Sequence, residues 1–355
     1  MKKIGLGATA IALSLGLATA GIAPAMAAGD LAGGGATFQA DFQSKCLAKF
    51  NAEKATVNKG IRVSYVGVGS GNGRTGLGNG TYAFAGSDSL GTKAGLTAAD
   101  SVYLPAVAAP LAIIVNLKST TNTKITSLNL TPEVLSDILR GNITTWDNSR
   151  IKAITGNTSL KLPSTSITVV SRSDSSGSTG NLKNYLAQNT SFAWPQSETN
   201  TGFATGQAMS GAPAVVAKVA AVDGAIGYAD LSDTTSAVTL VALQNKAGAF
   251  IKPSATAAAN YVKATGVLTP KTDAAITTNG GIYTVDFTKS VAGAYQISFI
   301  SYMVGKKGLN NTDTKVYLNY MLTKCSNSPA GIGAGSYTTV GTTLLAVAKA
   351  QVAKL

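Results

Sequence analysis

The sequence predicts an α/β protein of two domains with mostly parallel sheets. Some segments alternate apolar and polar residues, which is typical of strands, and others repeat apolar residues at helical spacing. The predicted strands and helices alternate along the chain. Two extended apolar segments, 101–117 and 294–307, bracket the middle of the 355 residues. We therefore expect the chain to cross into a second domain and to return, which leaves its two ends in the first domain.

Each predicted element rests on a local pattern. Aromatic residues recur at helical spacing over 39–52, after a glycine-rich start. Thr131 as cap, Pro132 at the first helical position and Gly141 as stop define a helix over 131–141. The other expected strands are 60–69, 81–86, 166–170 and 225–231; the other expected helices are 177–188, part of 206–224, one starting near Ser254, 315–325 and 339–355.

Residues 1–27 have the pattern of a secretory signal peptide that is cleaved after Ala27. Lys2 and Lys3 precede an apolar run, which ends in the small-residue pattern of a cleavage site. A retained membrane anchor is the alternative, because an apolar run of about 20 residues is long enough to span a bilayer. No cysteine stands at the cleavage point to carry a lipid. We expect an exported protein, either periplasmic or secreted.

The composition excludes several kinds of site. The chain has no histidine, so a Ser-His-Asp triad cannot form, and two cysteines are too few for the usual zinc sites. Cleavage removes two lysines and no acidic residue, which lowers the net charge from +13 to +11. This charge either attracts anions or only maintains solubility. Because the cations are scattered and aromatic residues are few, we expect no nucleic-acid partner. We expect no cofactor and no metal.

The two cysteines, Cys46 and Cys325, lie near opposite ends of the exported chain. An oxidising compartment allows a disulfide between them, and two free thiols are the alternative. The disulfide requires both ends of the chain to pack in one domain.

Glycine- and serine-rich loops stand where strands end or helices begin. Three of them are 33–38, 66–73 and 171–181, and a polar turn at 85–90 follows a strand. Helix N-termini bind anions through unpaired N–H groups, and glycine lets the backbone approach a ligand closely. Each loop alone is equally typical of a surface turn. Neither the P-loop pattern GxxxxGK[ST] nor the nucleophile pattern GxSxG is present in them.

Taken in order, these loops resemble a known family. The motifs are GGGATFQADF, VGVGSGNG, FAGSDSL, LRGNITTWDNSRI, VVSRSDSSGSTGNL, GAIGYADL and KKG. They are similar to those of the PstS family, the periplasmic phosphate-binding proteins of the phosphate-specific ABC transporter, over about 33–310. The resemblance implies a type II-like Venus-flytrap fold of two α/β domains, with the ligand in the cleft between them and two crossing strands as the hinge. Domain I would comprise 28–107 and 298–355, and domain II 108–297.

The resemblance also implies a role for each matching residue. Arg172 would hold phosphate by charge-assisted bonds, and Asp174 would fix Arg172 in place. The other residues implied in phosphate binding, through hydroxyl, carboxyl or backbone N–H groups, are Thr37, Phe38, Ser70, Asp88, Ser176, Gly177 and Ser178. A surface ion pair of Arg172 with Asp174 is the alternative, but the position of Arg172 after an apolar strand and before a helix N-terminus favours an anion site.

Asp88 is the residue on which selectivity would depend. A carboxylate in an anion site repels the ligand unless the ligand brings a proton. Phosphate carries O–H groups at neutral pH and sulfate does not, so an ionised Asp88 would accept a bond from phosphate and reject sulfate. Such sites discriminate by about 10⁴–10⁵. A turn-capping aspartate is the alternative, because Gly-Ser-Asp-Ser is typical of turns.

The function implied is binding of inorganic phosphate and its delivery to the membrane permease subunits of an ABC importer, by a monomer that is not an enzyme. The alternatives are a binder of sulfate, molybdate or tungstate, a secreted relative of the DING phosphate binders without a transporter, and an exported phosphate-ester hydrolase. Three features depart from the family: serine at 178 where threonine is common, the extra hydroxyl of Ser175, and Arg74, which would add positive charge near the cleft.

Overall fold

The computed structural model describes residues 30–204, 206–265, 269–270, 283–309 and 311–355, so the predicted signal peptide lies outside the described residues. The strands are β1 Asp30–Gly35, β2 Arg62–Gly67, β3 Phe84–Ser87, β4 Ser101–Asn116, β5 Asn129–Leu130, β6 Thr168–Arg172, β7 Gln207–Met209, β8 Ala225–Asp230, β9 Thr239–Leu240, β10 Ala242–Gln244, β11 Phe250–Ile251, β12 Thr269–Pro270, β13 Tyr283–Thr284 and β14 Ser298–Lys306. The helices are α1 Ala40–Ala52, α2 Ala55–Asn58, α3 Ser70–Gly78, α4 Pro132–Leu139, α5 Ser149–Lys152, α6 Gly177–Asn189, α7 Ala212–Ala221, α8 Ala255–Ala264, α10 Asn311–Tyr320 and α11 Thr342–Val352, with short helical turns at Thr37–Gln39, Leu231–Asp233, Met321–Cys325 and Ala330–Ile332.

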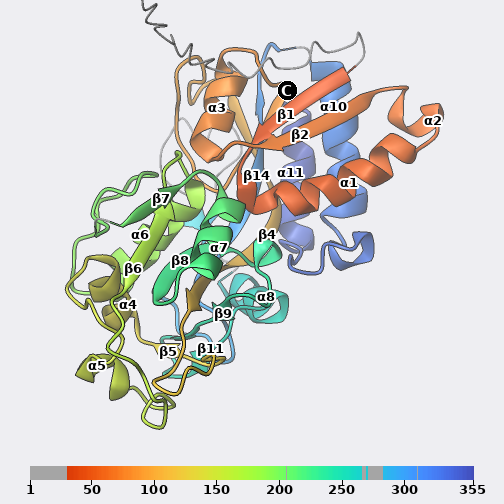
Figure 1. Cartoon of the computed structure of the whole chain (residues 1–355). Coiled ribbons are helices and arrows are strands. Elements are labelled where there is room, and N and C mark those ends of the chain that lie inside the picture. Colours follow the sequence, from red (N-terminus) through yellow and green to blue (C-terminus); the bar gives the residue numbers. More distant parts are fainter. Residues whose placement is uncertain (1–29, 205, 266–268, 271–282, 310) are drawn as a thin grey trace, which may run out of the picture.

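One nine-stranded sheet runs through the molecule in the order β2-β1-β3-β14-β4-β8-β6-β7, with β9 also paired to β4 (Figure 1). The prediction of mostly parallel sheets is correct only toward the two ends, where β1 pairs parallel with β2 and β3, and β6 with β7 and β8. The middle is antiparallel. β14 runs opposite to both β3 and β4, because the chain that leaves along β4 comes back along β14.

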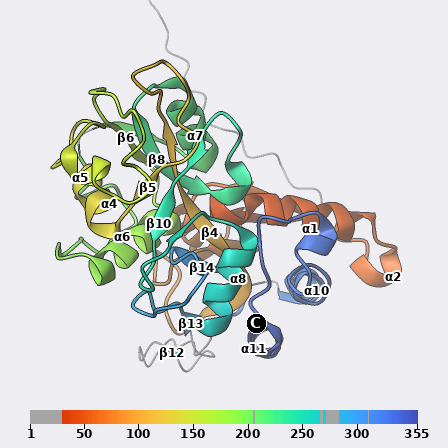
Figure 2. The ribbon, with the colours of Figure 1, turned by 90° about the horizontal axis from the view of Figure 1, so that it is seen from below.

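β4 and β14 are the two extended segments that the sequence predicts, and they divide the molecule. We call the elements before β4 and after β14 the first lobe, and those between β4 and β14 the second lobe. The first part of β4 pairs with β14 and its last part, from Leu111, with β8. Figures 1 and 2 show α1, α10 and α11 on one side of the molecule and α4, α5, α6 and α7 on the other.

Proline is tolerated inside β4 because both prolines fall where the ladder is irregular or ends. Pro105 stands next to a shift of register opposite Ser301 and Tyr302 on β14. Pro110 pairs with Ser298, the first residue of β14. A proline cannot donate to a neighbouring strand, so bulges and strand ends are the places that admit it. The two prolines are therefore compatible with one continuous strand over Ser101–Asn116.

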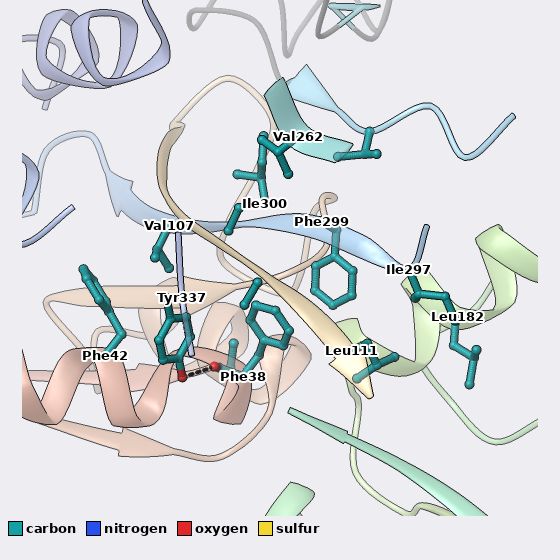
Figure 3. Packing of buried hydrophobic residues seen from close by; sticks show 14 of the residues in the cluster. Phe38, Phe42, Val107, Leu111, Leu182, Val262, Ile297, Phe299, Ile300 and Tyr337 are labelled. Atoms are coloured by element: carbon teal, nitrogen blue, oxygen red, sulfur yellow. Dashed lines mark hydrogen bonds between the residues drawn. The ribbon is translucent and has the colours of Figure 1, made fainter. Parts of the chain in front are cut away.

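The central strands are buried between aromatic and aliphatic side chains from both lobes (Figure 3). Phe38 stacks on Phe299 with 4.5 Å between ring centroids. The Tyr337 hydroxyl donates to the carbonyl of Phe38 at 2.6 Å. This packing fixes the helical turn Thr37–Gln39, which precedes α1 and carries the first two predicted site residues, Thr37 and Phe38.

α3 was not predicted as a helix, because its sequence SGNGRTGLG carries four glycines, which cost helix stability. Close packing explains them. A Cβ on Gly73 would lie 2.4 Å from the Cα of Gly35 on β1, and a Cβ on Gly78 would lie 2.2 Å from the carbonyl of Ala94. The glycines let α3 lie directly against the sheet, and this brings its N-terminus to the edge where β1 and β3 end. The short strand β7 was not predicted either.

A disulfide joins Cys46 on α1 to Cys325 after α10, with 5.7 Å between their Cα atoms. Both ends of the described chain are thereby tied into the first lobe. Within the described residues no helix is long and apolar enough to cross a membrane.

We expect the free energy of unfolding to fall by about 2–5 kcal/mol when both cysteines are replaced by alanine, because the bond restrains a separation of 279 residues in the unfolded chain. Urea unfolding of the oxidised wild type and of the double variant measures the difference. Wild type unfolded with a reductant present is the control and should match the double variant. A difference below about 1 kcal/mol would show that the bond contributes little.

Candidate functional site

The predicted site residues all follow the carboxyl ends of strands, and the structure brings them together. Thr37 and Phe38 follow β1, Ser70 follows β2, Asp88 follows β3, Arg172 closes β6, and Ser176, Gly177 and Ser178 follow β6. In α/β sheets the crevice outside these strand ends is where ligands bind. Each residue is buried in this arrangement, and the two lobes contact one another across it.

Thr37 and Arg172 join the lobes directly. The Arg172 Nη1 of the second lobe donates to the Thr37 Oγ1 of the first lobe at 3.0 Å. Arg172 is only 1% exposed, although it is a charged residue. Phe38 plays a different part from its neighbour. Its ring is buried in the aromatic core, so only its backbone N–H remains to face a ligand.

Arg172 is held by the partner that the sequence predicts. Its Nε donates to Asp174 Oδ1 at 2.7 Å, and its Nη2 bonds the second carboxylate oxygen. The N–H of Gly211 donates to the same Asp174 Oδ1 at 3.0 Å. Burial lowers the pKa of Arg172, but the hydrogen bond and the charge of Asp174 outweigh it, so the pKa is raised. A rigid cation is thus fixed at the site.

Ser70 and Asp88 form a second polar pair on the first lobe. The N–H of Asp88 donates to Ser70 Oγ at 3.1 Å, and this hydroxyl lies 3.3 Å from Asp88 Oδ2. Ser301 of β14 donates to Asp88 Oδ1 at 2.5 Å. Burial raises the pKa of Asp88 to about 7, although these hydrogen bonds and the Arg172 charge act to lower it. The Asp88 carboxyl therefore changes its protonation state near neutral pH.

The N-terminus of α6 faces this pair. Ser176 caps the helix and accepts from the N–H of Thr179 at 3.2 Å. A Cβ on Gly177 would lie 2.5 Å from Ser70 Oγ and 2.8 Å from Asp88 Cβ, so only glycine fits between the lobes here. The helix end offers unpaired N–H groups and a partial positive charge.

The sequence reasoning missed two residues of the site. Asp230, the last residue of β8, is 1% exposed and accepts from Ser178 Oγ at 3.3 Å and Thr37 Oγ1 at 3.4 Å. Burial, and then the charge of Asp233, raise its pKa well above the usual range. Ser301 was missed too. The position of Asp230 at the end of a predicted strand was a usable signal, whereas Ser301 lies in mid-strand and gave none.

The charges of this site are unbalanced. Arg172 faces the carboxyls of Asp174, Asp230 and Asp88, of which Asp88 and Asp230 are buried and Asp174 is partly buried. A ligand without protons would add negative charge beside these carboxyls. A ligand that carries an acidic O–H can instead donate to one of them, so the arrangement favours a protonated oxyanion.

A cleft of about 950 Å³ lies beside the buried cluster and reaches it at Asp88 and Ser175. Thr37, Arg172 and Ser178 do not line this cleft. Because an anion needs the buried donors, we place the candidate site in the cluster and regard the cleft as its exposed flank.

Comparisons with known proteins show the family and the fold of this chain. A family model described as a PBP superfamily domain matches residues 21–324. The phosphate-binding protein PstS of Haemophilus influenzae is 32% identical over 241 residues, which cover 66% of this chain and 69% of that protein. The chain belongs to the PstS family of this superfamily.

Other PstS proteins and solved structures show how far the likeness extends. PstS of Xylella fastidiosa is 34% identical over 229 residues, or 63% of this chain, and the chain spans about 60% of that relative's length. A high-affinity periplasmic phosphate-binding protein, PfluDING, solved with bound phosphate, superposes with a TM-score of 0.68 at 22% identity and covers 90% of this chain and 93% of its own. The fold is therefore the two-domain periplasmic binding protein fold, as predicted.

Proposed function

We propose that this chain binds inorganic phosphate between its two lobes and delivers it to the permease subunits of an ABC importer. One observation carries the proposal: a buried carboxyl, a buried guanidinium and a helix N-terminus meet in one place. Asp88 lies against Gly177 at the start of α6, within the field of Arg172. Arg172 and the helix end attract an oxyanion, while Asp88 requires that it carry a proton.

The ligand contacts proposed are those predicted from the sequence, together with Asp230. Ser178 and Thr37 both donate to Asp230 in the structure, and their hydroxyls would turn from this carboxyl to phosphate when the ligand binds. The complete set proposed for phosphate binding is Thr37, Phe38, Ser70, Asp88, Arg172, Ser176, Gly177 and Ser178, with Asp174 and Asp230 in support.

The proposal extends to the organisation of the chain. Domain I would comprise 28–107 and 298–355, and domain II 108–297, with β4 and β14 as the hinge. The change of partner along β4, from β14 to β8 at Leu111, supports this division. The protein would act as an exported monomer that binds its ligand and carries out no chemistry.

Calorimetric titration of the mature, phosphate-stripped protein with phosphate and with sulfate tests the function. We expect one tight phosphate site and little heat from sulfate, because sulfate cannot donate to Asp88. Sulfate binding as tight as phosphate binding would overturn the proposal. Molybdate and tungstate serve as further competitors.

A further inference from the structure

A second cluster of charged residues joins the lobes outside the proposed phosphate site; Arg74 is buried in it, and Glu198 and Lys93 are partly buried. Its centre is the Glu198 carboxylate, on the segment between α6 and β7 of the second lobe. Three groups of the first lobe bind it: Arg74 Nη2 and Ser89 Oγ both bond Oε1, and Lys93 Nζ lies 3.3 Å from Oε2. These partners belong to α3 and to the loop after β3, so every one of these contacts spans the cleft.

Glu198 is held rigidly on its own lobe. Ser175 Oγ donates to Glu198 Oε2 at 2.6 Å, and the N–H of Ser176 donates to the Glu198 carbonyl at 2.9 Å. The neighbours of Glu198 in the sequence are also held: Lys183 Nζ, on α6, donates to Ser197 Oγ at 2.7 Å and to the carbonyl of Thr199 at 2.9 Å. The carboxylate is therefore presented to the first lobe in a fixed position.

Arg74 meets Glu198 in an equally fixed position. Its side chain is 2% exposed, and its Nη1 donates to the carbonyl of Ser89 at 2.8 Å. Burial raises the pKa of Glu198, but the Arg74 charge and the hydrogen bonds of Ser175 and Ser89 outweigh it and bring the pKa to about 2. The pair is thus ionised. Two of the three departures from the family, Arg74 and Ser175, both bind Glu198.

We propose that Glu198 and Arg74 are positioning residues that hold the cleft closed and so slow the release of phosphate without touching it. The predicted effect on phosphate release rests on the proposed function. The predicted effect on closure of the lobes does not depend on it. When the lobes separate, Glu198 loses its three partners from the first lobe and keeps those of its own. Breaking a bridge of this kind changes the equilibrium between open and closed forms, which appears mainly in the dissociation rate.

The variant Glu198→Gln tests this, because it keeps the shape and removes the charge. Spin labels at Thr56→Cys in the first lobe and Lys152→Cys in the second report the distance between lobes, since both sites are exposed and the native cysteines are paired. We expect longer distances in the ligand-free variant than in the ligand-free labelled parent, and stopped-flow release of phosphate about tenfold faster. Lys93→Gln, at the exposed rim of the bridge, should shift both measurements in the same direction by less.

Asp137→Asn is the matched control. Asp137 binds Arg140 and Arg150, so its loss removes an ion pair within one lobe. Unchanged distances and an unchanged release rate in Glu198→Gln, as in Asp137→Asn, would overturn the inference. A wild type that binds no phosphate would overturn the proposed function instead, and the distances in the ligand-free protein would still test the bridge. Should Glu198→Gln fail to fold, Lys93→Gln provides the same test, and no shift in it would count against the bridge.

Discussion

Replacing Arg172 with alanine is expected to weaken phosphate binding by about 30- to 5,000-fold. Loss of one partner from a buried, hydrogen-bonded charge pair costs about 2–5 kcal/mol, and this range of affinities follows from it. The variant loses the guanidinium that would hold phosphate, and it also leaves the partly buried Asp174 without its counterion. Both effects act in the same direction, because an uncompensated Asp174 repels the incoming anion.

Calorimetry measures the affinity, and urea unfolding of the ligand-free variant separates it from a loss of stability. Arg150→Ala is the control, since Arg150 also pairs with an aspartate but its side chain is 51% exposed. We expect phosphate affinity to be unchanged in Arg150→Ala, because exposed ion pairs contribute about 0–1 kcal/mol. Phosphate affinity within a factor of three of wild type in Arg172→Ala would remove Arg172 from the site.

The candidate site residues stand at the ends of elements that local sequence patterns predicted, but their roles came from the resemblance to PstS proteins. Arg172 ends β6 and Ser176 caps α6, where the sequence predicted only a polar loop between a strand over 166–170 and a helix over 177–188. Asp88 follows a strand in a polar turn, where a ligand residue and a turn cap look the same. The resemblance to PstS proteins, rather than the pattern alone, favoured the ligand role.

What the sequence could not predict depends on contacts between distant segments. Glu198 lies 124 residues from Arg74 and 109 from Ser89, in an irregular segment with no periodicity. Nothing local distinguishes it from a solvated surface glutamate. α3 was not predicted for a related reason. Its glycines are explained by close contacts with distant segments, such as the backbones of Gly35 and Ala94. Helix propensity describes the isolated segment and not this neighbour.

Replacing Asp88 with asparagine should abolish most of the discrimination between phosphate and sulfate. A site built around a ligand O–H rejects the analogue without it by about 10⁴–10⁵. Asparagine removes the charge that repels sulfate and supplies an N–H that can donate to it. We therefore expect sulfate affinity to rise strongly, while phosphate affinity falls by a smaller factor. Competition titrations of the two anions measure the ratio.

The matched control for this substitution is Asp100→Asn. Asp100 caps a turn of the first lobe, where its Oδ1 accepts from the N–H of Thr97 at 2.7 Å, and it lies outside the site. It represents what Asp88 would be if it were only a turn cap. Equal phosphate-to-sulfate ratios in Asp88→Asn, Asp100→Asn and wild type would show that Asp88 plays no part in selectivity.

The pH dependence of the same ratio follows from the pKa of Asp88, which burial raises to about 7. Above this pH the carboxylate is ionised and excludes sulfate; below it the protonated carboxyl can donate to sulfate as asparagine does. Wild-type discrimination should therefore weaken as the pH falls through neutrality, whereas that of Asp88→Asn should stay low at every pH. If discrimination changed with pH equally in both proteins, another group would be responsible for the titration. Asp230, a buried carboxyl of the proposed site whose pKa is raised, is the candidate.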